Sequence, residues 1–190
     1  MPDIIRECSQ GYFRLTLADE MLQHREVECL GEIDAASAYS LCRQLRYLQR
    51  EDPEGEITLF INSPGGEVPS GLAVYDVMQG ISCPVRTVCL GTAASMAAVL
   101  FAAGDRRDIL PHARVLIHDP RTSQGVGGSA LQVQEASREL MRTRDTLGRI
   151  LARHTGRSLK EIYRKTERDT IFSAEEAVAF GLADRIVQTV

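Results

Sequence analysis

Three units repeat along the middle of the chain, and this repeat constrains the fold more than any other feature of the sequence. In each unit an apolar run leads through a turn of small residues into a helical pattern. The apolar runs are EITLFIN, VRTVCL and ARVLIH, and the turns after them are SPGGEVPSG, GTAAS and DPRTSQGVGG. The helical patterns are LAVYDVMQG, MAAVLFAAG and the long segment 129–156. Such alternation predicts an α/β fold with largely parallel strands. Because ligands collect at the carboxyl ends of parallel strands, we expect the functional residues in SPGG, GTAAS and HDP.

Elements on either side of these units have their own signals. An amphipathic helix is expected from Asp34, its cap, because four apolar residues recur at helical spacing. These are Ala38, Leu41, Leu45 and Leu48. Near the end of the chain, Ser173 and Glu176 have the spacing of a capping box. Gly181 suits the C-terminal cap of that short helix, and ADRIV is expected to form a closing strand or turn.

Length and composition exclude several classes of function. The chain of 190 residues is expected to form a single domain, residues 1–190. A net charge of -4 without a basic run argues against nucleic acid as a partner. No run of eighteen apolar residues predicts a membrane span, and the first ten residues, MPDIIRECSQ, lack the apolar segment of a secretory signal. A cytoplasmic location is therefore expected.

The five cysteines indicate neither a disulfide framework nor a metal site. They are Cys8, Cys29, Cys42, Cys83 and Cys89. Their number is odd, none has CxxC spacing, and none pairs with a nearby histidine in a zinc-like pattern. We expect reduced, mostly buried thiols, and neither a metal nor another cofactor.

Ser95, within GTAASMAA, has two interpretations. Its hydroxyl can accept a hydrogen bond from a first-turn amide and so cap the following helix. It can also act as a nucleophile, since a helix N-terminus offers free amides and favours negative charge. The amide of Met96 is the natural donor to an oxyanion, and the surrounding alanines leave room for a substrate carbonyl.

The other parts of a serine hydrolase are present in the neighbouring turns. The two glycines of SPGG allow close approach of a ligand, and an amide there can be a second oxyanion donor. His118 ends an apolar strand, which suits a general base, whereas His24 and His154 lie in polar surroundings and His112 follows a proline. The pattern does not choose the acid that orients the base. Five aspartates near turns stay open: Asp105, Asp108, Asp119, Asp169 and Asp184.

Read in order, SPGG, GTAASMAA, VLIHDP and TERDTIFSAEEAVAFGLAD resemble the ClpP family, the proteolytic subunits of the caseinolytic protease. The resemblance covers roughly residues 30–187. It implies the ClpP/crotonase-like fold and a serine endopeptidase that needs no metal or cofactor. It identifies Ser95 as the nucleophile, His118 as the base and Asp169 as the acid, with oxyanion donors at the amides of Gly66 and Met96.

The same resemblance implies an assembly and partners. Two stacked rings of seven identical subunits would enclose the active sites, and a separate AAA+ unfoldase would feed them unfolded polypeptides. Residues of roughly 119–153 would form a handle region whose helix, after Gly128, protrudes between the rings. Arg168 would contact the opposite ring. Residues 1–29 match the family only loosely and form a divergent N-terminal segment. An apolar substrate pocket is expected near Val68 and Leu72.

The chain departs from the family at two places. The stretch DPRTSQGVGGSALQVQ is about two residues longer than usual and replaces apolar positions of the ring-contact strand by polar ones, so ring pairing is expected to be altered. On the surface where unfoldases insert apolar loop tips, Phe60 and Leu90 fit the family. Thr58 and Asp108 stand where aromatic residues are more usual. Burying the Asp108 charge against an apolar tip is costly, so docking is expected to be weaker or altered.

Two other functions remain open at this point. A non-catalytic ring subunit would assemble with an active paralogue and would not react with a fluorophosphonate. An acyl-CoA enzyme of the crotonase architecture would use a similar pair of amides without a serine nucleophile, and acyl-CoA ligands would stabilise it against heat.

Overall fold

The computed structural model describes residues 4–9, 11–122 and 125–189 of this chain. The helices are α1 (Leu17–Gln23), α2 (Ala35–Glu51), α3 (Val68–Gly80), α4 (Met96–Ala102), α5 (Ala130–Thr155), α6 (Leu159–Thr166) and α7 (Ala174–Phe180). The strands are β1 (Ile4–Cys8), β2 (Gly11–Leu15), β3 (Glu26–Ile33), β4 (Ile57–Gly66), β5 (Val85–Ala94), β6 (Arg106–Ile109), β7 (Arg114–Ile117), β8 (Thr170–Phe172) and β9 (Arg185–Ile186).

A largely parallel sheet is the centre of the fold, as the alternating pattern predicts. Its main path is β3-β4-β5-β6-β9, and every pairing on this path is parallel. The outer side of β5 divides: residues 86–89 pair with β6, and residues 92–94 pair with β7. Strand β8 then pairs antiparallel with β7. The division of β5 separates β6 from β7 near the residue that follows β5, Ser95.

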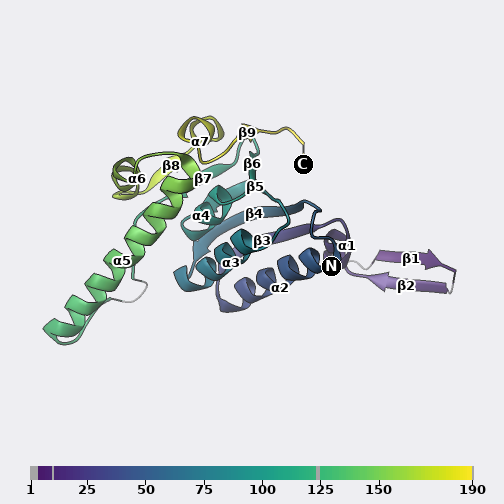
Figure 1. Cartoon of the computed structure of the whole chain (residues 1–190), viewed down its shortest axis with the longest axis horizontal. Coiled ribbons are helices and arrows are strands. Elements are labelled where there is room, and N and C mark those ends of the chain that lie inside the picture. The colour runs from purple at the N-terminus through teal and green to yellow at the C-terminus, as the bar shows by residue number, and fades with distance from the viewer. Residues whose placement is uncertain (1–3, 10, 123–124, 190) are drawn as a thin grey trace.

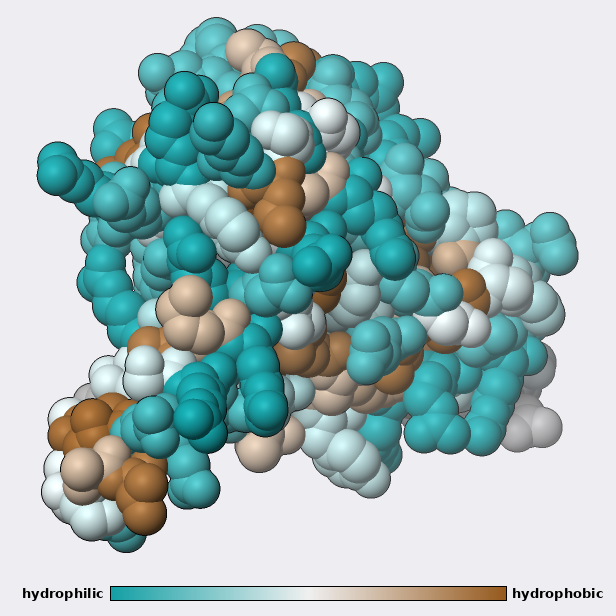
Figure 2. Space-filling view, turned by 60° about the vertical axis from the view of Figure 1, so that its left-hand side comes forward, coloured by the Kyte–Doolittle hydropathy of each residue, from teal (hydrophilic) through white to brown (hydrophobic). Residues whose placement is uncertain are grey.

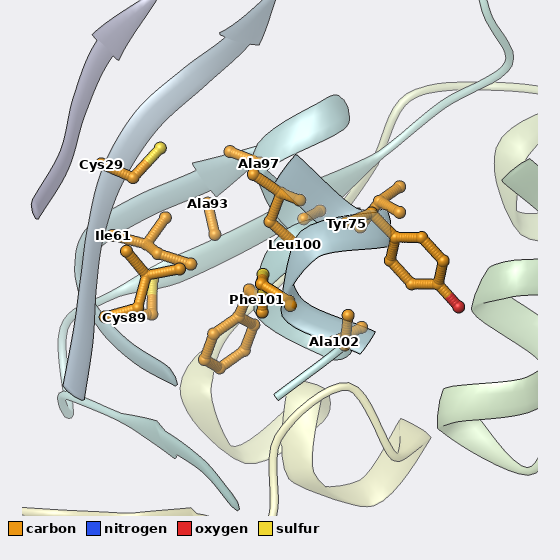
Figure 3. Packing of buried hydrophobic residues seen from close by; sticks show 14 of the residues in the cluster. Cys29, Ile61, Tyr75, Cys89, Ala93, Ala97, Leu100, Phe101 and Ala102 are labelled. Atoms are coloured by element: carbon orange, nitrogen blue, oxygen red, sulfur yellow. The ribbon is translucent and has the colours of Figure 1, made fainter. Parts of the chain in front are cut away.

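Helices α2, α3 and α4 cover one face of this sheet (Figure 1). The core lies between them, where every residue of α4 is buried against β4 and β5. Figure 3 shows Leu100 and Phe101 of α4 among Ile61, Ala93 and Cys89 of the strands. The alanines of α4 bring its backbone close to the sheet, because a small side chain leaves little separation between packed elements.

The handle predicted after Gly128 is a single long helix. Ser129 caps α5 through a capping box with Gln132, and Gly156 ends it in a left-handed conformation, so both boundaries follow from local sequence. The helix projects away from the sheet (Figure 1), and only Gly148 and Leu151 are fully buried. Figure 2 shows apolar atoms gathered at its free end, and Leu131 and Val133 are exposed in its first turn.

Most predicted elements are confirmed, and the small-residue segments are the main correction. The helix from Asp34 buries the four residues that its periodicity indicated, and Ser173 and Gly181 cap α7 as expected. By contrast, SPGG and GTAA are not turns, because they continue β4 and β5 to Gly66 and Ala94. The sheet pairs both segments with neighbouring strands, and the sequence does not indicate this long-range pairing.

The part of the handle region that precedes α5 has no regular secondary structure. Residues 119–122 and 125–129 form neither helix nor strand, and residues 123 and 124 lie outside the described part of the chain. Cys29, Cys83 and Cys89 are buried free thiols, and Cys42 is half-buried. Burial raises the pKa of Cys29 to about 11 and that of Cys89 to about 12. In the described ranges no helix combines the length and hydrophobicity of a membrane span.

Candidate active site

Ser95 occupies the sharp junction between β5 and α4. Its backbone has a φ of 55° and a ψ of -121°, a conformation that non-glycine residues rarely adopt. Its amide donates to the Leu116 carbonyl of β7 at 2.9 Å, which ties the junction to the neighbouring strand. The predicted capping bond is wrong, since the Ser95 hydroxyl makes no cap hydrogen bond. The hydroxyl is therefore not used by the helix, and backbone strain of this kind is concentrated at functional sites.

Gly65 and Gly66 bring the end of β4 against this junction. Their φ values are 93° and 157°, which favour glycine. A Cβ atom on Gly65 would lie 2.6 Å from the Ala94 carbonyl oxygen and 2.7 Å from Ser95 Cβ. Met96 is the first residue of α4, so its amide has no acceptor within the helix. The predicted oxyanion donors thus come from segments that lie in direct contact beside Ser95.

His118 follows β7 and lies on the same cavity as Ser95. Its Nδ1 lies 2.6 Å from the carbonyl oxygen of Asp119, and because a carbonyl only accepts, Nδ1 carries the proton. In its neutral form this imidazole has its lone pair on Nε2, the nitrogen that serves as base in a serine triad. In the described part of the chain no hydrogen bond joins His118 to Ser95 or to Asp169.

Asp169 lies outside this cavity and forms an ion pair with Arg121. The two side chains are 49% and 65% exposed, and such exposed pairs contribute at most about 1 kcal/mol. The structure therefore brings Ser95, His118, Gly66 and Met96 to one cavity, whereas the Asp169 carboxylate is engaged by Arg121. Arg168 is exposed, and its side chain has no hydrogen bond or ion pair with the described residues, so its ring contact stays a prediction.

The four other candidate acids have partners that fix the fold. Asp119 accepts from Arg144 Nε and from Thr166 Oγ1, each at 2.6 Å. Asp105 accepts a hydrogen bond from the Val85 amide, and Asp108 accepts from Arg86 and Arg185. Asp184 accepts from Arg107. Among the five aspartates, Asp169 has the most exposed ion pair, so breaking that pair is expected to cost the least free energy.

The cavity has a volume of about 1040 Å³ and extends from the strand ends to α5. Val68, Val99, Leu147 and Leu151 give it an apolar part, which is suited to an apolar substrate side chain. Val68 lies where the substrate pocket is expected, but Leu72 packs against the core instead. Among the described residues no cluster of three or more His, Cys, Asp or Glu has the arrangement of a metal site.

Comparison with known families agrees with the motifs. The family model described as Clp protease matches residues 9–190. The chain therefore belongs to the Clp protease family. The match begins well before residue 30, where the motif resemblance starts, and so it includes most of the N-terminal segment. The mixed α/β architecture with its parallel sheet agrees with the ClpP fold. Membership implies peptidase activity, and the assignment of individual residues stays a prediction.

Sequence reasoning missed the residues that control the acid. Neither hydrophobic periodicity nor a short motif marks Arg121 as functional. Only its ion pair with Asp169 in the folded chain reveals it. Thr166 and Arg144 likewise anchor Asp119, whose backbone carbonyl accepts the hydrogen bond from His118 Nδ1–H. An arginine two residues after His-Asp is the one local signal available, and it does not indicate its partner 48 residues later.

Proposed function

We propose that this Clp protease family chain is a serine endopeptidase that hydrolyses unfolded polypeptides, with Ser95 as nucleophile and His118 as base. One observation carries the proposal: Ser95 has a strained backbone and a hydroxyl that makes no capping bond. It lines the same cavity as His118, Gly66 and Met96. His118 Nε2 takes the Oγ proton as Oγ attacks the peptide carbonyl, and the Gly66 and Met96 amides bind the oxyanion. His118 then returns the proton to the leaving amine, and water hydrolyses the acyl-enzyme by the reverse sequence.

In the proposed active form, Asp169 exchanges Arg121 for the Nδ1–H of His118. The Asp119 carbonyl already selects the required tautomer, but a neutral carbonyl stabilises an imidazolium less than a carboxylate does. Because the Arg121–Asp169 pair is exposed, breaking it costs at most about 1 kcal/mol. A local rearrangement of the Asp169 side chain therefore completes the triad, in which the carboxylate stabilises the His118 imidazolium without taking its proton.

Intact-mass measurement after treatment with a fluorophosphonate tests the nucleophile. We expect one adduct per chain, and none in Ser95→Ala. Ser70→Ala is the matched control, because Ser70 also lies in the first turn of a helix near the cavity but its hydroxyl is engaged by Glu67. A folded wild-type protein that stays unlabelled, or an adduct that persists in Ser95→Ala, contradicts the proposal.

A non-catalytic ring subunit is the second candidate, and the pairing of Asp169 with Arg121 instead of His118 favours it. Such a subunit would keep the oligomer contacts but leave Ser95 unreactive. The labelling experiment separates the two functions: Ser95 of a non-catalytic subunit stays unlabelled both alone and after assembly with an active paralogue.

We further propose a cytoplasmic homo-oligomer of two stacked seven-subunit rings that works with an AAA+ unfoldase, since Clp proteases generally form rings of this kind. Asp108 supports altered docking. It is fully buried between Arg86 and Arg185, so a charged cluster stands where an apolar tip would need an apolar contact. Undiminished stimulation of peptide hydrolysis by an unfoldase with apolar loop tips would overturn this expectation.

A further inference from the structure

The outer side of α2 carries three arginines that the proposed peptidase mechanism does not use. Arg43, Arg46 and Arg50 are spaced by three and four residues, which places them on one side of the helix, opposite its buried leucines. All three are exposed, together with Tyr47, which is 49% exposed. They span about 10 Å along the helix axis.

These arginines border a groove rather than a flat surface. The groove has a volume of about 530 Å³, and Leu22 of α1 and Gln44 of α2 complete its wall. We call it the arginine groove. Figure 1 shows α2 on the outside of the helical layer, away from α4 and from the projecting α5. The cavity that holds Ser95 lies at the start of α4. The arginine groove is therefore separate from the proposed active site.

No ion pair with a described residue neutralises the positive charge of the groove. No carboxylate in residues 4–9, 11–122 and 125–189 forms an ion pair with Arg43, Arg46 or Arg50. Acidic residues outnumber Lys and Arg by 26 to 22, and many other arginines of the chain are paired. The groove is thus a local cationic site on a protein of net negative charge.

We propose that the arginine groove binds an acidic segment of a partner protein. Guanidinium groups recognise carboxylates with paired hydrogen bonds, and three of them along two helical turns suit carboxylates at comparable spacing. Leu22 and the ring of Tyr47 provide an apolar contact between the charges, which suits a peptide that carries an apolar side chain. Nucleic acid fits less well, because the net charge of -4 repels a long polyanion and the cationic stretch is short.

Fluorescence anisotropy with a labelled (Glu-Glu-Leu)3 peptide tests the proposal on the full chain. We expect saturable binding that weakens between about 50 and about 300 mM NaCl, since screening affects exposed charges. The triple variant Arg43→Gln, Arg46→Gln, Arg50→Gln is expected to bind about tenfold more weakly. The matched control removes three exposed charges elsewhere: Arg138→Gln, Lys160→Gln and Arg164→Gln. It is expected to bind within about twofold of wild type.

Charge reversal makes the test independent of folding defects. The variant Arg43→Glu, Arg46→Glu, Arg50→Glu is expected to bind a (Lys-Lys-Leu)3 peptide in place of the acidic one. Absence of wild-type binding to the acidic peptide, equal weakening by the control variant, or tighter binding of a labelled oligothymidylate overturns the proposal. Fluorophosphonate labelling of Ser95 is expected to be unchanged in every variant, so the result does not depend on the peptidase assignment.

Discussion

At the scale of single residues, the site is defined by which partner each polar side chain has. The Ser95 hydroxyl has no capping role, His118 Nδ1 donates to a neutral carbonyl, and Asp169 holds Arg121. Two of the three predicted triad residues thus share the cavity, and the third stands in an exposed ion pair outside it. Reactivity is consequently expected to depend on Arg121, a residue with no direct role in the chemistry.

Replacing Arg121 is expected to make Ser95 more reactive. Arg121→Leu removes the competing cation, so Asp169 can turn to His118, and the rate of fluorophosphonate labelling is expected to rise by up to about fivefold. Arg121→Lys preserves an ion pair and should stay close to wild type. The gain should disappear when Asp169→Ala is added to Arg121→Leu. An unchanged labelling rate in Arg121→Leu would show that Arg121 does not keep Asp169 from His118.

Gly65 is expected to be intolerant of any side chain. In Gly65→Ala the new Cβ atom meets the Ala94 carbonyl and Ser95 Cβ, and the residue has a φ of 93°. Displacement of Ser95 by a few tenths of an ångström or more is expected to lower the labelling rate about a hundredfold. Urea denaturation is expected to show a loss of about 1–3 kcal/mol. Gly125→Ala, where a Cβ meets nothing within 4 Å, is the control and should change neither quantity.

At the scale of elements, the ends of β4 and β5 decide where the site forms. The register between β4 and β5 shifts between Ile61 and Ser63, and β5 then leaves β6 and pairs with β7. This change of partner brings the end of β7, and so His118, next to the end of β5 and Ser95. The long helix α5 covers the opposite side of the cavity through Leu147 and Leu151.

The contact between α3 and α5 is expected to make stability depend on pH. Tyr75 and His154 are 3.2 Å apart through Oη and Nε2. Burial, and then the charges of Arg107 and Arg153, lower the pKa of His154. The folded state then binds fewer protons than the unfolded state, so the free energy of unfolding is expected to fall as the pH drops below about 6.5. Urea denaturation between pH 8 and pH 5 measures this slope, which should be smaller in His154→Gln. An equal slope in that variant would contradict the assignment.

At the scale of the whole molecule, α5 exposes large apolar side chains that no other part of the described chain covers. Leu131 and Met141 are 72% and 57% exposed on a helix that leaves the sheet (Figure 1). Exposed apolar groups of this kind mark contact surfaces. The ring pairing proposed above would cover them with a second copy. Residues 125–129 before α5 form neither helix nor strand, so they provide no strand for that contact.

A double substitution on α5 tests ring pairing. Leu131→Glu with Met141→Glu places charges on the contact surface, and light scattering is expected to show a particle of about half the wild-type mass, because burying unpaired charges opposes association. Exposed Arg138 and Arg142 lie on the same helix, and Arg138→Ala with Arg142→Ala serves as the control for changes that leave the apolar side chains in place. A wild-type particle mass in the double-glutamate variant would remove α5 from the ring contact.

The sequence by itself determined the strand–helix order of the three central units, the buried side of α2, the caps of α2 and α7, and the candidates Ser95 and His118. These features depend on hydrophobic period, capping residues and short motifs, which act over a few residues. Only the tertiary structure decided that SPGG and GTAA continue strands, that Asp108 is buried between two arginines, and that Asp169 binds Arg121 instead of His118. Each of these depends on partners far apart in the chain, because strand pairing and ion pairs join residues whose separation in sequence carries no local pattern.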